Sequence, residues 1–156
     1  METIVLKELE ASNDDVFVIL SDVWLNEPRI IAKLKALFEG FKEAPPFCFI
    51  FMGNFVSSPA VFYGSDKRKY GRMLYLYGQA SHSVEYFDIL ADLIAEHETI
   101  LERSQFVFIP GALDGFGLNI LPYPKIPDVF IRKFKNKVPK STFASNPCRY
   151  VSRIFC

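Results

Sequence analysis

The sequence lacks an excess of either charge, since its 156 residues include 18 Lys and Arg and 18 Asp and Glu. A protein that grips DNA unaided usually carries a basic excess, because neutralising phosphates supplies most of the affinity. The charge balance therefore argues against a self-sufficient DNA-binding protein. It predicts that any action near nucleic acid passes through partner proteins.

Cysteine and histidine are also scarce. The three cysteines are Cys48, Cys148 and Cys156. An odd number of cysteines does not indicate a disulfide framework. The acidic N-terminal segment does not resemble a secretory signal. Together these features predict a reducing compartment, the nucleus or cytosol. No apolar run approaches the roughly 20 residues that span a bilayer, so we expect no membrane segment.

Apolar and aromatic residues are plentiful, at 50% and 15% of the chain, which predicts one packed domain. Continuous β-branched and aromatic runs predict buried strands, and apolar residues at helical spacing predict helices between them. The expected strands are Val16–Leu20, Phe47–Met52, Gln105–Ile109, Ser141–Ala144 and Tyr150–Phe155. The expected helices are Pro28–Gly40, Val84–Arg103 and Asp128–Lys137.

Alternation of these elements predicts an α/β fold, a mostly parallel sheet flanked by helices. Residues 1–15 are charged and are interpreted as a helical lead-in or linker before a domain over residues 16–156. The stretch of about 60–83 is irregular and carries the basic cluster Lys67–Arg72, so we interpret it as an insertion at the carboxyl side of the sheet. A solvated loop and a DNA contact are both open for that cluster.

Three expected strands end in polar signals. Ser21 and Asp22 follow the first, Gly53 and Asn54 the second, and Pro110 to Asp114 the third. Because ligands of open α/β sheets bind beyond the carboxyl ends of strands, we expect these signals to converge in space.

The order of these signals resembles the calcineurin-like metallophosphoesterases. That family places Asp-x-His, Gly-Asp and Gly-Asn-His-Asp/Glu after successive strands, with two later His motifs, and holds two metal ions that activate water. Here Asp22 matches the first Asp, but Trp24 stands at the His position and Asn54 at the bridging Asp position. Ala112 and Leu113 replace the Asn-His pair between Gly111 and Asp114.

A phosphoesterase pattern with these losses is typical of the B-subunits of eukaryotic replicative DNA polymerases, and among them it is most similar to those of polymerase epsilon. The resemblance runs from about Asp15 to Arg149. The segments that carry it are Phe17–Leu25, Phe49–Phe55, Arg103–Gly111, Ile120–Pro122 and the family motif Asn146, Pro147, Cys148 and Arg149.

The resemblance implies the first part of an inactivated phosphoesterase-like domain, without cofactor, metal or catalytic residue. It implies a nuclear accessory subunit that links the cysteine-rich C-terminal region of the polymerase epsilon catalytic subunit to other replisome proteins, and that meets DNA through the complex. We also expect the chain to lack the second half of the sandwich, to leave an apolar sheet face uncovered and to dissolve poorly alone.

The individual residues keep more than one interpretation. Asp22 is a ligand remnant or a turn cap, and Trp24 is a packing residue in the lost metal site or a subunit contact. Asn54 and Asp114 are expected to fix loops by hydrogen bonds, and His97, on an apolar helix stripe, is expected at the core or its boundary.

Three other functions compete with the accessory role. A B-subunit of another replicative polymerase fits the same pattern. An active phosphodiesterase or phosphatase needs at least five ligands, of which Asp22 is the one clear candidate. A nucleotide-binding domain needs a phosphate loop after the first strand, where the sequence has Ser21–Trp24 and no glycine.

Overall fold

The centre of the fold is a four-stranded sheet. The computed structural model describes residues 2–5, 16–57, 85–114 and 121–151, and its sheet has the order β2-β3-β4-β5 with every pair parallel. The predicted parallel α/β architecture is therefore confirmed. The strands are β2 Phe17–Ser21, β3 Cys48–Met52, β4 Gln105–Ile109 and β5 Ser141–Phe143.

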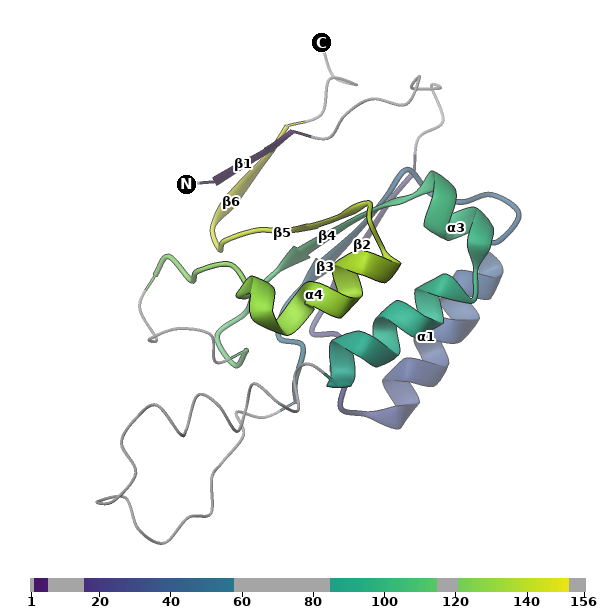
Figure 1. Cartoon of the computed structure of the whole chain (residues 1–156), viewed down its shortest axis with the longest axis horizontal. Coiled ribbons are helices and arrows are strands. Elements are labelled where there is room, and N and C mark those ends of the chain that lie inside the picture. The colour runs from purple at the N-terminus through teal and green to yellow at the C-terminus, as the bar shows by residue number, and fades with distance from the viewer. Residues whose placement is uncertain (1, 6–15, 58–84, 115–120, 152–156) are drawn as a thin grey trace, which may run out of the picture.

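The helices α1 (Pro28–Gly40) and α4 (Asp128–Lys137) have the predicted bounds. They lie on one face of the sheet together with a helix over residues 85–95, as Figure 1 shows. Pro28 occupies the first turn of α1, where its missing N–H costs no hydrogen bond. Asp128 places an acid in the first turn of α4, and Lys135 and Lys137 lie in the last, which complements the helix dipole.

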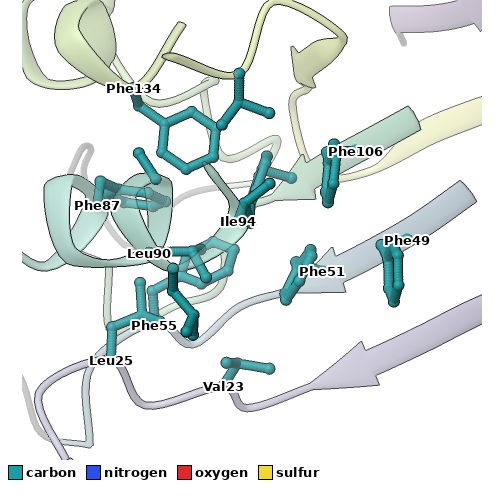
Figure 2. Close-up of a cluster of buried hydrophobic side chains, with 14 of the residues drawn as sticks. Val23, Leu25, Phe49, Phe51, Phe55, Phe87, Leu90, Ile94, Phe106 and Phe134 are labelled. Atoms are coloured by element: carbon teal, nitrogen blue, oxygen red, sulfur yellow. The ribbon is translucent and has the colours of Figure 1, made fainter. Parts of the chain in front are cut away.

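The main core lies between the sheet and the helices, and it is built from phenylalanine. The register of β3 and β4 places Phe49 beside Phe106 and Phe51 beside Phe108, with stacked rings 5.5 and 5.0 Å apart. Phe143 of β5 continues the stack at 4.6 Å from Phe108. The ring of Phe134 closes over them from α4, 5.1 Å from Phe108, in the cluster of Figure 2. Burial and ring packing together make this face the main source of stability.

The outer surface of the helical layer is charged. Lys133 and Lys137 of α4 pair with Asp88 and Asp92 of the neighbouring helix. These exposed pairs each contribute about 0.5 kcal/mol or less. Their main consequence is that this side of the molecule is polar.

The other face of the sheet is largely apolar and only partly covered. A small cluster around Cys48, Val107 and Ala144 is buried there. Toward the β2 edge, the side chains of Ile19 and Met52 are 63% and 41% exposed. The expected uncovered sheet face is therefore present around Ile19 and Met52.

Three predicted elements differ from the structure. The expected helix Val84–Arg103 is interrupted after residue 95, and a separate helix, α3, covers Glu98–Arg103. At His97 the backbone leaves helical geometry, with φ −117° and ψ 78°, while its ring bonds the carbonyl of Leu93. A side chain that bonds a carbonyl one turn back competes with the helix ladder at this point.

The ends of the chain also differ. Residues 2–5, expected in a helical lead-in or linker, form strand β1 (Glu2–Val5), since Thr3, Ile4 and Val5 favour extended backbone. Strand β1 pairs in parallel with β6 (Cys148–Val151), which begins two residues earlier than the predicted strand Tyr150–Phe155. Residues 6–15, the insertion of about 60–83 and residues 152–156 lie wholly or mainly outside the described residues. Within the described ranges, no helix combines the length and apolarity needed to cross a membrane.

Candidate functional site

The tips of β2, β3 and β4 meet, as the sequence predicts. Asp22 follows β2, Asn54 follows β3, and Asp114 follows β4. Their side chains bond across the gaps between the strands. The three polar signals therefore form one site, which we call the strand-tip site.

Asn54 joins the outer two strands of this site. Its side-chain Nδ2 donates to Oδ1 of Asp22 over 3.0 Å, and its backbone N–H donates to the same oxygen over 3.3 Å. Its Oδ1 accepts a bond of 2.8 Å from the backbone N–H of Leu113. An amide can act as donor and acceptor at once, which a carboxylate in the same place cannot do.

Asp114 is the buried acid of the site and is 6% exposed. Its Oδ1 accepts the N–H of Phe55, and its Oδ2 accepts the N–H of Gly111, each over 2.6 Å. Burial raises the pKa of Asp114 to about 6, against the opposing effect of these two bonds, and the negative charge of Asp22 adds to the rise. The predicted loop-fixing roles of Asn54 and Asp114 agree with these bonds.

Asp22 is exposed and adopts a left-handed backbone conformation, with φ 53°. Bonds from the backbone and side chain of Asn54, and a third from the Ser21 hydroxyl, lower the pKa of its carboxyl. Its backbone N–H donates to the carbonyl of Met52. Asp22 therefore closes the turn after β2 and also receives the bridge from Asn54.

Gly53, one of the signals that follow the strands, has a steric role in this site that the sequence interpretation did not assign to it. A Cβ on Gly53 would lie 2.2 Å from Oδ2 of Asp114 and 2.3 Å from the backbone nitrogen of Gly111. A Cβ on Gly111 would lie 2.5 Å from Oδ1 of Asn54. Both glycines are therefore required by the close approach of the two tips, and their position after strands was the available signal.

The side chains at the strand-tip site do not fit a two-metal centre. Asp114 already uses both oxygens on backbone donors, and Asn54 uses its amide on Asp22 and Leu113. The remaining family positions hold Trp24, Ala112 and the side chain of Leu113, which offer no oxygen, imidazole or thiolate. Within the described part of the chain, no three His, Cys, Asp or Glu side chains gather as a metal site would require.

Trp24 is 38% exposed, whereas its neighbours Val23 and Leu25 are 5% and 2% exposed and belong to the core. A second bridge, missed from the sequence, lies beside it. Asn26 donates to the hydroxyl of Ser57 and accepts its backbone N–H, over 2.8 and 2.9 Å.

The motif Asn146–Arg149 follows β5 and includes the first two residues of β6. Asn146 donates from Nδ2 to the carbonyl of Pro110, 2.8 Å away at the tip of β4, and exchanges two backbone bonds with Tyr123. Pro147 follows through a cis peptide bond, Cys148 packs against the small cluster on the open face, and Arg149 is exposed. The structure therefore brings Asn146 to the edge of the strand-tip site.

Comparison with known proteins agrees with this arrangement. Residues 17–152 match the family model of the B-subunits of DNA polymerases alpha and epsilon. The chain is 42% identical over 146 residues to DNA polymerase epsilon subunit 2 of Homo sapiens, covering 92% of the chain and 25% of that protein. It is 36% identical over 151 residues to the DNA polymerase epsilon B-subunit of Arabidopsis thaliana, covering 95% and 26%.

The matched segment spans about a quarter of the length of these relatives. It contains the whole four-stranded sheet and the strand-tip site, since β2 begins at Phe17 and β5 ends at Phe143. The family match covers well over half of the chain. The chain thus belongs to the B-subunit family of DNA polymerases alpha and epsilon.

Proposed function

We propose that this chain acts as a non-catalytic accessory subunit of the DNA polymerase epsilon complex in the nucleus. It holds the cysteine-rich C-terminal region of the catalytic subunit and links it to other replisome proteins. The observation that carries the proposal is the bonding at the strand-tip site, where Asn54 bridges Asp22 and Leu113. The positions that hold ions in related hydrolases are used here to bind strands to one another.

The charge of the chain supports action through partners. The formal net charge is zero, and the basic residues Lys133 and Lys137 of α4 are paired with acids. A phosphate-binding surface needs cations that are free to replace counterions. In this proposal, DNA is met through the assembled complex.

The open sheet face supports a place in a larger assembly. Ile19 and Met52 expose apolar surface beside the buried cluster of Cys48 and Val107. We propose that the described sheet is the first part of an inactivated phosphoesterase-like sandwich. Polypeptide corresponding to the rest of the relatives' length covers this face in the assembled protein.

Co-purification tests the accessory role. The tagged chain is co-expressed with the C-terminal region of the polymerase epsilon catalytic subunit, and separately with the corresponding regions of the polymerase alpha and delta catalytic subunits. The epsilon region is expected to co-purify in stoichiometric amounts and the other two are not. Equal retention of all three would assign the chain to no particular polymerase.

A second experiment covers the case in which binding requires residues beyond the matched segment. The same chain is extended with the segment that follows the match in the human relative, and the pull-down is repeated. Loss of epsilon binding in both forms, with both forms folded by circular dichroism, would overturn the accessory role.

A further inference from the structure

Trp24, the only tryptophan of the sequence, is held at the surface. The residues on either side of it, Val23 and Leu25, lie in the core cluster of Figure 2. The backbone N–H of Trp24 donates to the carbonyl of Asp22 over 3.1 Å, and its carbonyl accepts the N–H of Glu27 over 3.0 Å. Because the turn is fixed on both sides, the indole cannot withdraw into the core without breaking these contacts.

Other exposed apolar groups lie at the same end of the sheet. Met52 is 41% exposed where the open face reaches the strand tips, and Ala112, in the loop after β4, is also exposed. The N–H of Asp22 donates to the carbonyl of Met52 over 3.0 Å, so these two tips are adjacent. Asn54 bonds Asp22 on one side and the loop of Ala112 on the other. We give the name tip surface to the exposed groups of Asp22, Trp24, Met52 and Ala112.

The tip surface has a negative charge. The loops 21–27, 53–57 and 110–114 contain the acids Asp22, Glu27 and Asp114 and no lysine or arginine. Among the residues that the structure describes, neither Asp22 nor Glu27 forms an ion pair, and Arg29, the next cation along the chain, pairs with neither. A chain with no net charge therefore has one acidic end.

The carboxylate of Asp22 is available to a further donor. Bonds from the amides of Asn54 and from the Ser21 hydroxyl lower its pKa, so the group is ionised at neutral pH. Its Oδ1 accepts from Asn54, whereas the bond to its Oδ2 comes from the Ser21 hydroxyl. Each carboxylate oxygen can accept two hydrogen bonds, so Oδ2 can accept another without disturbing the bridge from Asn54.

An exposed indole near an ionised carboxylate fits a cation with an apolar stem. The face of an indole attracts a guanidinium or an ammonium group, and a carboxylate pairs with either. The methylene groups of Arg and Lys can cover apolar surface such as that of Met52. Phosphate groups have the same sign of charge as the tip surface and are repelled, which argues against nucleic acid as the occupant.

We propose that the tip surface docks a basic segment of a partner protein, which brings an arginine or lysine side chain to Trp24 and Asp22. The inference rests on the proposed accessory role and names the chemistry of one partner contact. The polar groups that would hold cations in a hydrolase here bind one another, and the outer side of the same site binds a cation that belongs to a protein.

Peptide binding tests the proposal. Two short capped peptides carry the same fluorescent label and the same leucine and alanine residues, and differ at two central positions, which are arginine in one and glutamate in the other. Fluorescence anisotropy gives their dissociation constants for the wild-type chain, Trp24→Ala and Asp22→Asn, after circular dichroism has shown each variant to be folded. Asp22→Asn removes the charge and keeps an oxygen that accepts from Asn54.

The arginine peptide is expected to bind the wild type and the glutamate peptide is not. Trp24→Ala and Asp22→Asn are each expected to raise the dissociation constant of the arginine peptide by about two- to fivefold, the value of one exposed cation–π contact or ion pair. The controls Val129→Ala and Glu102→Gln remove an exposed apolar group and an exposed acid away from the tips, and are expected to leave it unchanged.

Equal binding of the two peptides, no binding of either up to millimolar concentration, or equal losses in variants and controls would overturn the proposal. Co-purification with the region of the catalytic subunit reports on the accessory role by itself. The two proposals can therefore fail separately.

Discussion

The side-chain amide of Asn54 donates to the carboxylate of Asp22 across 3.0 Å, and so ties the tip of β3 to the tip of β2. In a two-metal phosphoesterase the residue at the Asn54 position is an acid, and cations separate it from its neighbours. Here no cation is needed between the two side chains, because the amide of Asn54 donates a hydrogen bond to the carboxylate of Asp22. The exchange of an acid for Asn54 thus removes a negative charge and, at the same time, joins the strand tips by hydrogen bonds.

Replacing Asn54 with Asp tests this relationship. The new carboxylate can still accept from Leu113, but it cannot donate to Asp22, which keeps only the longer bond from the backbone N–H of residue 54. We expect Asn54→Asp to lower the free energy of unfolding at pH 7, because the side-chain bond to Asp22 is lost and two like charges then meet. Urea denaturation at pH 7 measures the loss.

The matched control is Asn26→Asp, the same change in the adjacent loop. Asn26 donates to the Ser57 hydroxyl, which can itself donate to a carboxylate, so the loss is expected to be smaller. Equal losses of unfolding free energy in the two variants would show that the Asn54 bridge stabilises the fold no more than an ordinary loop hydrogen bond.

Gly53 gives a steric test of the same site. A Cβ there would lie 2.2 Å from Asp114 and 2.3 Å from the backbone of Gly111, so Gly53→Ala must push two strand tips apart. We expect a loss of about 3 kcal/mol, at the upper end for overpacking. Thermal unfolding compares it with Gly40→Ala, where nothing lies within 4 Å of the added carbon.

Gly40 ends α1, where alanine is the better helix former, so Gly40→Ala is expected to be neutral or slightly stabilising. A Gly53→Ala variant as stable as Gly40→Ala would mean that the tips are not held as closely as the structure shows.

Asp114 predicts a pH dependence. The pKa of its carboxyl is about 6 in the folded chain, above the value of 3.8 for an unperturbed group, so the folded state favours the protonated acid. The contribution of Asp114 to stability is therefore full below about pH 4 and is lost as the pH rises through 6. Between pH 5 and 7, we expect the wild type to lose about 1–2 kcal/mol relative to Asp114→Asn.

Urea unfolding of both proteins at several pH values measures this difference. Asp22 and Asp128, whose pKa values are lowered, act in the opposite direction and at lower pH in both proteins. A difference that does not change with pH, or that grows with rising pH, would show that the bonds from Phe55 and Gly111 outweigh burial.

The open sheet face predicts the behaviour of the chain alone. Ile19→Thr combined with Met52→Thr keeps strand-compatible side chains and removes exposed apolar surface. We expect the double variant to remain monomeric at higher concentration than the wild type, as measured by light scattering. The control is Val129→Thr on α4, since Val129 is 73% exposed on the charged helical side. An equal gain in the concentration at which the control stays monomeric would show that association does not depend on the open sheet face.

Much of the fold could be predicted from the sequence. The runs Phe17–Leu20 and Phe106–Ile109 are continuously apolar because the sheet interior leaves little room for polar side chains. The bounds of α1 and α4 follow from Pro28, Gly40 and Asp128. The meeting of Asp22, Asn54 and Asp114 could also be predicted, because parallel strands present their carboxyl ends at one edge.

Other features depend on contacts between distant segments and could not be predicted from local pattern. The break at His97 arises where its ring bonds Leu93 and meets Glu39 of another helix, while the sequence there keeps helical spacing. Strand β1 is short and exists as the partner of β6, at the other end of the chain. The need for glycine at Gly53 follows from the position of Asp114, 61 positions later, since a Cβ on Gly53 would lie 2.2 Å from its Oδ2.

Manganese titration followed by NMR tests the central claim, that the polar groups of the strand-tip site bind one another in place of two cations. Mn²⁺ is added in stoichiometric steps to ¹⁵N-labelled chain at pH 7, and the amide signals of Asp22, Asn54 and Asp114 are compared with those of the rest of the sheet. We predict uniform, weak broadening without a preference for these three residues. Selective loss of their signals at one or two equivalents of Mn²⁺ would contradict the account.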